Sequence, residues 1–504
     1  MKKLLVSLVL AAVAVVASAA RPVARWDVVP HQRVKGVFKA GVVGFHEKGV
    51  RVEFSVNGKR AFEASAPTLN ERTGVWEFVF PLDVAKLPEG PVKLGATAIA
   101  PGEPPYALPE LPLYADAKEN LGSRKTVTVG PGESLKDAIA QVGDGGTVYL
   151  KAGEYATGGL GGGKNRSYWT TLAAAPGVKR EEVQVAGGRS GTDKIRYRGL
   201  TLFCDAEGKY ASVLGGENGA TCCWLDDCVV MNRKGRWACN AQVFGNRMVG
   251  YVTGGLTTEM NNGPGCTLQR NHEVRKIASD VWTGSDCLVV NCRASDVDPG
   301  TTGAHPDFHQ SYARAPGFVH DVILYNVKGW DCKCQGLFGV RLRDSAFVNV
   351  SFERVPDACF YSQYSDEMIN VIFAHITLVN QPWLWRQGKK GKDGDYAPTD
   401  VRVFNCVFLS MGGFEGLNTD GSNGLLVHHN AFYGTDRKGR TVAPYGLNGL
   451  QISRSFADEA KKDFSLKAGS PALAGGVALQ CVPADINGKP YPKSGSRPCG
   501  AYAK

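Results

Sequence analysis

The sequence DVILYNV at residues 321–327 is one copy of the pattern that decides the fold. DCLVVNC at residues 286–292 precedes it, and DSAFVNVSF at residues 344–352 follows it. Each copy is a short run of apolar, mostly branched residues with an Asp before it and an Asn within it, which is typical of a β-strand bounded by turns. Similar segments begin at Asp227, Asn370, Val401 and Gly424.

The spacing of the asparagines inside these segments gives the length of a repeat. Asn326 lies 23 residues before Asn349, Asn405 lies 25 before Asn430, and 35 residues separate Asn291 from Asn326, which leaves room for an inserted loop. Periods of about 20–50 residues indicate stacked coils. In such a stack each strand pairs with the next coil at ~4.8 Å, and every second side chain faces a narrow core.

The length of the chain agrees with a stack of coils. Single cores stop growing near ~250–300 residues, whereas repeats add length without a wider core. The chain has 504 residues, of which 62 are Gly. We therefore expect an elongated, all-β architecture.

The start of the repeat region carries a recognisable pattern. Ser134 can cap a short helix through Val142, and GDGGTVYLKAGEY at residues 143–155 then turns into a strand. This region resembles the N-terminal cap and first coil of pectate-lyase-like right-handed parallel β-helix proteins. The resemblance covers roughly residues 125–480 and implies a right-handed single-stranded β-helix, while residues 481–504 resemble the tail that follows the last coil in many secreted members.

A separate domain precedes the β-helix. Alternating apolar residues at 50–56, an Asn57-Gly58 turn and further alternating strands predict a small Ig-like β-sandwich over residues 20–114. Five prolines within residues 101–114 stiffen its end, and residues 115–124 form a linker. We expect the remainder to fold when residues 21–114 are deleted.

The first 19 residues predict a signal peptide. Lys2-Lys3 precede an apolar run from Leu4 to Val16, and Ala17-Ser18-Ala19 has the small-x-small form of a cleavage site. The run is shorter than the ~20 residues of a membrane span, and no comparable run follows. The expected location is therefore secreted or periplasmic.

The net charge limits the possible partners, and the positions of the cysteines indicate their redox state. A net charge of +10 can attract a polyanion, but no basic helix or zinc-finger spacing points to nucleic acid. We expect the protein to be a monomer. Twelve of the 14 cysteines lie in or near strand-like segments, where Cys behaves as a small buried hydrophobe. Cys481 and Cys499 flank a loop-like tail and are predicted to form a disulfide.

The densest polar cluster is HPDFHQ at residues 305–310. If Phe308 packs inward, alternation places Asp307 and His309 outward, ~7 Å apart on one strand, in a groove open to a sugar ring. His309 is the predicted proton-transferring group because His titrates near neutrality, with His305 as the alternative base. Asp307 would orient a histidine or the substrate.

Residues of neighbouring coils extend the candidate groove. Inward-facing Cys332 and Cys334 would turn Lys333 outward, where its ammonium group would meet an anionic group of the substrate. The remaining predicted substrate-binding residues come from the same and adjacent coils: Asp280, Gln310, Asp331, Gln335, Arg341, Arg343 and Tyr361.

This set of residue types favours one chemistry over another. β-Elimination on a uronic acid needs a cation for the carboxylate, a base for the C5 proton and a proton for the leaving oxygen. Hydrolysis needs two flanking carboxyl groups, for which only Asp280, Asp307 and Asp331 are available. We therefore expect an exported carbohydrate-active enzyme that cleaves an acidic polysaccharide, with a lyase favoured over a hydrolase.

Two alternatives stay open. The His-Pro-Asp-x-His run can be a loop whose side chains bond the backbone, in a protein that only binds polysaccharide or serves in adhesion. Calcium is also open as a cofactor, because three carboxylate pairs lie in loops: Asp226 with Asp227, Asp296 with Asp298, and Asp393 with Asp395.

Overall fold

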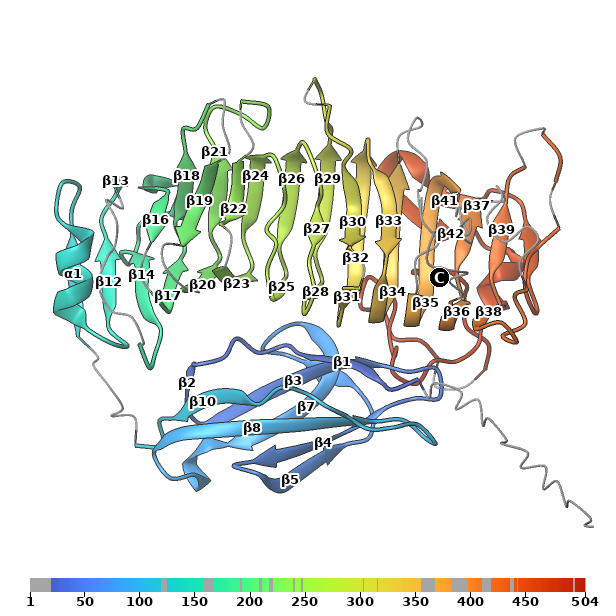
Figure 1. Ribbon diagram of the computed structural model, residues 1–504, viewed down its shortest axis with the longest axis horizontal. Coiled ribbons are helices and arrows are strands. Elements are labelled where there is room, and N and C mark those ends of the chain that lie inside the picture. The colour runs from blue at the N-terminus through green and yellow to red at the C-terminus, as the bar shows by residue number, and fades with distance from the viewer. Residues whose placement is uncertain are drawn as a thin grey trace, which may run out of the picture.

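The computed structural model describes residues 20–118, 125–156, 166–190, 193–207, 211–216, 221–238, 241–245, 248–301, 303–314, 316–354, 368–382, 398–409, 418–435, 439–441, 443–492 and 495–503. The predicted architecture is confirmed: a right-handed parallel β-helix follows a β-sandwich (Figure 1). The predicted signal peptide lies outside the described residues.

The N-terminal domain consists of two sheets whose strands are antiparallel except for the parallel pair of β2 and β10. The alternating apolar residues of its strands face each other across the core that the two sheets enclose. One sheet has the order β1 (Val23–Trp26), β3 (Val37–Phe45), β7 (Val75–Asp83), β6 (Thr68–Asn70). The other has the order β2 (Arg33–Val34), β10 (Leu111–Ala115), β8 (Gly90–Ile99), β4 (Arg51–Val56), β5 (Lys59–Ala64), with β9 (Tyr106–Ala107) beside β8.

The β-helix begins with the predicted cap. Helix α1 (Leu135–Val142) buries Leu135, Ala138, Ile139 and Val142 against the first coil, and the Ser134 hydroxyl accepts a hydrogen bond from the Asp137 N–H at 3.2 Å. This side-chain acceptor satisfies one of the free N–H groups at the start of the helix. The prediction for this segment is confirmed.

Parallel strands line three sides of the coils, which we call the first, second and third sheets. β32 (Ile323–Cys332), β34 (Leu342–Arg354) and β35 (Met368–Pro382) bend from the first into the second, so these two sides belong to one continuous 24-stranded sheet. The first sheet also contains β11 (Thr126–Val129), β12 (Thr147–Leu150), β14 (Thr170–Ala174), β17 (Ile195–Arg198), β20 (Thr221–Asp226), β23 (Met248–Thr253), β25 (Leu268–Arg270), β28 (Leu288–Val290), β31 (Val319–His320), β36 (Thr399–Phe404) and β38 (Leu425–His428). The second contains β13 (Gly153–Ala156), β15 (Val183–Ala186), β18 (Thr201–Cys204), β21 (Val229–Asn232), β24 (Leu256–Met260), β26 (Glu273–Ile277), β29 (Arg293–Val297), β37 (Val407–Leu409), β39 (Ala431–Tyr433) and β40 (Leu450–Ile452). The third is made of β16 (Gly188–Ser190), β19 (Ala211–Gly216), β22 (Ala241–Phe244) and of β27 (Trp282–Thr283), β30 (Asp307–Tyr312), β33 (Gln335–Val340).

A left-handed residue turns each coil from the first sheet into the second. Asn291, Asn326 and Asn349 stand at this corner with φ between 52° and 54°. Asn tolerates this conformation better than most residues, and its amide can also bond to the next coil. Asn326 donates to the Asn291 side-chain oxygen at 3.1 Å, and Asn349 donates to that of Asn326 at 2.9 Å. The period read from these asparagines is therefore the period of the coils.

One match in the predicted repeat is off by one residue. Asn405 stands at its corner with φ 56°, but the corner of the next coil is His429, with φ 52°. Asn430 is buried instead, and its side-chain oxygen accepts from the Cys406 N–H at 2.9 Å. His can replace Asn at the corner because its ring nitrogens make comparable hydrogen bonds.

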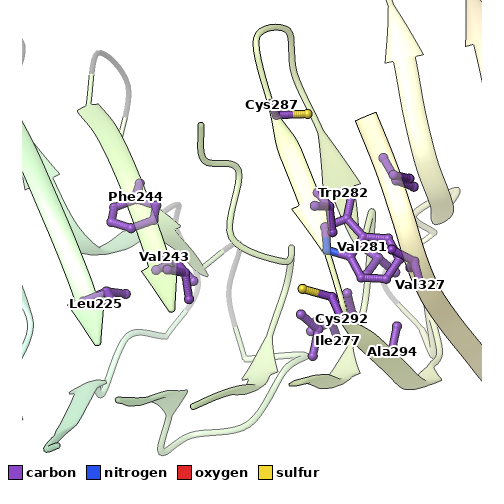
Figure 2. Close-up of a cluster of buried hydrophobic side chains, with 14 of the residues drawn as sticks. Leu225, Val243, Phe244, Ile277, Val281, Trp282, Cys287, Cys292, Ala294 and Val327 are labelled. Atoms are coloured by element: carbon purple, nitrogen blue, oxygen red, sulfur yellow. The ribbon is translucent and has the colours of Figure 1, made fainter. Parts of the chain in front are cut away.

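The interior of the coils is a narrow apolar core. Figure 2 shows part of it, where Ile277, Trp282 and Cys292 come from neighbouring segments of the stack. Cys332 and Cys334 are both buried in this core, as predicted. The predicted disulfide is wrong, because Cys481 and Cys499 are free and lie in different apolar clusters. The Cys481 thiol donates to the His46 carbonyl at 3.6 Å, and the Cys499 thiol donates to the His429 carbonyl at 3.2 Å.

The β-sandwich lies along the outer face of the first sheet (Figure 1). One apolar cluster includes both its core and the outward side chains of the first sheet. Arg270, on β25, pairs with the fully buried Asp27 of the sandwich. The β-helix residues in this shared cluster are Trp169, Trp224, Tyr251, Leu268, Leu288, Val290, Ile323, Tyr325, Ala346, Val348, Ile372, Ala374 and Phe404.

The C-terminal segment covers part of the second sheet. The last parallel strand, β40, ends at Ile452, so the tail is longer than the predicted residues 481–504. It contains the hairpin of β41 (Phe456–Asp458) and β42 (Asp463–Leu466), after which the Tyr502 hydroxyl donates to Ser351 at 2.9 Å and the Ala501 N–H to the Thr377 hydroxyl at 2.9 Å. Among the helices described, none is both apolar enough and long enough to span a bilayer.

Candidate functional site

The predicted cluster at residues 305–310 lies on the third sheet, but its side chains do not face a groove. Phe308 is buried in the core, as expected, yet Asp307 and His309 are only 3% and 1% exposed. The register places His309 in line with Trp282 and Leu337, whose side chains are buried in the core. The predicted outward orientation is wrong: three consecutive side chains, Asp307 to His309, are buried, so both sides of the strand are covered at this point.

His309 is held in an apolar environment. Its ring lies 5.1 Å from that of Phe347, edge to face, and its Nδ1 is 3.3 Å from the Ser311 hydroxyl. Burial lowers the pKa of His309 to about 3, so the ring is neutral at pH 7. An imidazole enclosed in the core does not reach a polysaccharide, and its lowered pKa makes it a weak base, so the geometric basis of its predicted role is lost.

Asp307 and Asp280 form a buried carboxyl pair at the start of β30. The Asp307 N–H donates to the Asp280 side chain at 3.0 Å, and Gln310 donates to the Asp307 carboxyl group at 3.0 Å. Burial raises the pKa of Asp280 to about 6, and burial together with the charge of Asp280 raises that of Asp307 to about 8. Asp307 is therefore protonated at neutral pH.

This pair predicts a loss of stability at alkaline pH. A carboxyl group with a raised folded-state pKa stabilises the protein fully below its unfolded pKa and loses this contribution as pH rises through the folded value. We expect the melting temperature of the wild type to fall between pH 6 and pH 8. Asp307→Asn keeps an acceptor for Gln310 and cannot ionise, so it should be more stable than the wild type at pH 8 by on the order of 3 kcal/mol.

The measurement is thermal unfolding from pH 5 to pH 9. Asp298→Asn is the matched control, because Asp298 is paired with Lys333 at 3.0 Å near the surface and its pKa is lowered, not raised. The control should keep the alkaline loss of the wild type. A wild-type melting temperature that is constant over this range would contradict the raised pKa of the pair.

The other predicted residues are dispersed. Lys333 is exposed, as predicted, and pairs with Asp298, while Asp331 pairs with Lys462 at 2.7 Å. Arg341 is buried and donates to the Gly317 carbonyl at 2.8 Å, so its side chain holds the backbone and does not face a groove. His305 and Arg343 are exposed, Gln335 is half-buried in register with Asp307, and Tyr361 lies outside the described residues.

The described carboxylates considered for calcium all have cationic partners. Asp226 pairs with Arg196, Asp227 with Arg180, Asp296 with Arg236, and Asp298 with Lys333. Asp393 and Asp395 lie outside the described residues. In the described part of the chain, Asp286, His320 and Asp321 bring possible ligand atoms within 4.8 Å of one another, but Arg25 and Arg21 of the sandwich pair with the two carboxylates at 2.9 Å. Calcium binding stays a prediction.

An open cleft lies on the outer face of the second sheet, which sequence reasoning did not single out. Two adjoining cavities of about 700 and 380 Å³ share Arg293 and Lys328, and we call them together the Arg293–Lys328 cleft. Trp76, on β7 of the sandwich, and the tail residues Asn487 and Tyr502 also line it. The cleft is therefore built from all three parts of the chain.

The floor of the cleft is a ladder of side chains from successive coils. Glu273 on β26 is in register with Arg293 on β29, and Arg293 is in register with Lys328 on β32. Strands of a parallel sheet are ~4.8 Å apart, so the two cations lie within reach of one sugar residue. Trp330, Phe464 and Tyr502 add aromatic surface beside Lys328.

The charges of the cleft are unbalanced. Arg293, Lys328, Lys461 and Lys462 line it, whereas Glu273 is the one carboxylate among the described lining residues. Lys461 and Lys462 pair with carboxylates beside the cleft, so the excess positive charge is that of Arg293 and Lys328. The side chain of Arg293 makes no hydrogen bond or ion pair with a described residue. The ammonium group of Lys328 makes no ion pair with a described residue and donates to the side-chain oxygen of Asn487. A site of this kind favours an anionic ligand.

Lys328 has a shifted acidity. Burial, and then the positive charge of Arg293, lower the pKa of the Lys328 ammonium group below its ordinary value of 10.5. Both effects disfavour the charged form of the side chain. A lysine of lowered pKa beside an unpaired arginine combines a potential base with a carboxylate-binding group.

The comparisons with known proteins give only distant likenesses. No family model matches the sequence, and no curated protein matches it. A PL6 family alginate lyase is 12% identical over 73% of this chain, with a TM-score of 0.36, and this chain spans 59% of its length. A PL6 family polysaccharide lyase from Pseudopedobacter saltans is 12% identical, covering 70% of this chain and 99% of that one, with a TM-score of 0.33.

A third solved structure is the catalytic domain of a GH87 α-1,3-glucanase in complex with tetrasaccharides. It is 11% identical, covers 85% of this chain and 84% of that chain, and has a TM-score of 0.24.

Proposed function

We propose that the protein is an exported enzyme, secreted or periplasmic, that cleaves an acidic polysaccharide by β-elimination in the Arg293–Lys328 cleft. The observation that carries this proposal is the pairing, in register on adjacent coils, of an unpaired Arg293 with a Lys328 of lowered pKa. The cleft is open, cationic and partly aromatic, which suits a chain of uronate sugars.

The elimination needs three roles, and two residues can fill them. Arg293 binds the carboxylate of the uronate and stabilises the charge that develops when C5 loses its proton. The neutral amine of Lys328 removes this proton, the C4–C5 double bond forms, and the bond between C4 and the glycosidic oxygen breaks. The resulting Lys328 ammonium group returns the proton to the leaving oxygen, so atoms and charge balance.

Hydrolysis fits the cleft less well. A glycoside hydrolase places two carboxyl groups on either side of the scissile bond. Glu273 is the one carboxylate among the described lining residues, and the Asp280–Asp307 pair is buried behind the third sheet. The remaining alternative is binding without cleavage, for which the unpaired cations alone would be sufficient.

The proposal is tested by incubating the protein with polygalacturonate, alginate and other uronate polymers. Absorbance that rises near ~232 nm, where the conjugated double bond formed at C4–C5 absorbs, supports elimination. Arg293→Ala should raise KM for the polymer about tenfold, more at low salt than at high salt, because it removes a charge–charge contact. New reducing ends without this absorbance would indicate hydrolysis, and polymer retention without either product would indicate binding alone.

A further inference from the structure

A second pocket lies on the same two strands as the cleft. It has a volume of about 340 Å³ and contains Trp237, Lys276 and Asp296 among its lining residues. β26 carries Glu273 in the cleft and Lys276 in the pocket, and β29 carries Arg293 in the cleft and Asp296 in the pocket. Three residues of strand span at most ~10 Å, and Lys276 and Asp296 stand at a bend, with φ of 51° and 52°, so the pocket lies a short distance from the cleft, at this bend.

Trp237 is exposed but fixed. Half of its surface, 50%, is open to solvent, although large aromatic residues are usually buried. Its indole N–H donates to the Asp298 carbonyl at 3.3 Å, and the Arg236 guanidinium carbon lies 4.7 Å from the centre of the ring. Gly300 lies against the ring so closely that a Cβ there would be 2.5 Å from Trp237 Cε2.

The contacts around Trp237 hold the ring before any ligand binds. Arg236 is itself fixed by Asp296, through the carbonyl at 2.7 Å and the carboxylate at 3.2 Å. An immobilised aromatic side chain loses little entropy on binding and offers a flat apolar surface. The C–H-bearing face of a sugar ring is the complementary surface.

The surface between the two pockets is polar and open. Arg275 and Ser295 are in register on the outer face between them, and Arg275 is exposed. A single sugar bound to Arg293 does not reach Trp237, whereas a polymer that runs along the strands reaches both. The two pockets together therefore select for chain length.

We propose that Trp237 is a substrate-binding residue that stacks on a sugar ring of the same polysaccharide chain, remote from the ring that is cleaved. This inference rests on the proposed function for the position of the reacting ring. It makes the preferred substrate a polymer whose chain lies parallel to the strands of the second sheet.

The experiment compares Trp237→Ala, Trp237→Phe and the wild type on a uronate polymer and on a uronate dimer, which is too short to occupy both pockets. Trp237→Ala should raise KM for the polymer about tenfold and leave kcat unchanged, while dimer kinetics stay at wild-type values. Trp237→Phe should restore most of the affinity. Tyr312→Ala is the control, because Tyr312 is also exposed, at 53%, but lines neither pocket.

A second measurement keeps this inference separate from the proposed function. Native gel electrophoresis with polygalacturonate or alginate in the gel reports binding without any need for turnover. Retention that Trp237→Ala reduces would support the stacking residue even if no polymer is cleaved. Equal retention of wild type and Trp237→Ala, or an equal rise of KM for polymer and dimer, would overturn the inference.

Discussion

Lys328→Ala should lower turnover of the uronate polymer by about 10²–10⁴-fold, the range typical of a lost general base. The loss should fall mainly on kcat, because Arg293 still binds the carboxylate. Turnover by the wild type should rise with pH until Lys328 is neutral, and the midpoint should lie below the ordinary lysine value of 10.5, because burial and Arg293 lower this pKa. The measurement is the initial rate near ~232 nm as a function of pH.

Two variants distinguish the role of Lys328 as a base from its role as a positive charge in the cleft. Lys328→Arg keeps a cation in the cleft but cannot lose its proton, so it should bind the polymer and remain as inactive as Lys328→Ala. Lys461→Ala removes a lysine from the same cleft that already pairs with Asp458 at 2.9 Å, and should keep wild-type turnover. An active Lys328→Arg variant would exclude Lys328 as the base.

The sequence was sufficient to predict the fold because the same local signal recurs. Asn291, Asn326 and Asn349 need a left-handed backbone at each corner, and the apolar residues beside them need a core. Both requirements repeat with every coil, so the repeat can be read without knowledge of distant contacts. The helix cap at Ser134 is equally local, and it too was predicted correctly.

The candidate site could not be predicted in the same way, because it depends on contacts between distant segments. Strand alternation was expected to turn His309 outward, but the chain at this point buries three consecutive residues. Arg293 and Lys328 lie 35 residues apart in segments with no unusual composition. Their cleft exists because β7 of the sandwich and the tail at Asn487 form its walls. A ladder of outward cations at equivalent coil positions was the one signal in the sequence that could have indicated it.

The contact between the sandwich and the β-helix argues against the expected independence of the two domains. Domains joined by a proline-rich segment often fold independently, so deletion of residues 21–114 was expected to leave a folded remainder. The outer face of the first sheet instead shares one apolar cluster with the sandwich, and it carries Trp169, Trp224 and Tyr325. Deletion would expose this apolar surface and leave Arg270 without Asp27.

We therefore expect a variant that lacks residues 20–118 to be aggregated or unfolded, with no cooperative thermal transition, as measured by gel filtration and circular dichroism. Co-expression of residues 20–118 as a separate chain should restore a soluble complex, because the interface is extensive and apolar on both sides. Restoration in trans distinguishes the loss of this interface from a chain that cannot fold for other reasons. A soluble, monomeric deletion variant that melts at the wild-type temperature would show that the β-helix is stable alone, and that the sandwich serves only as a wall of the cleft.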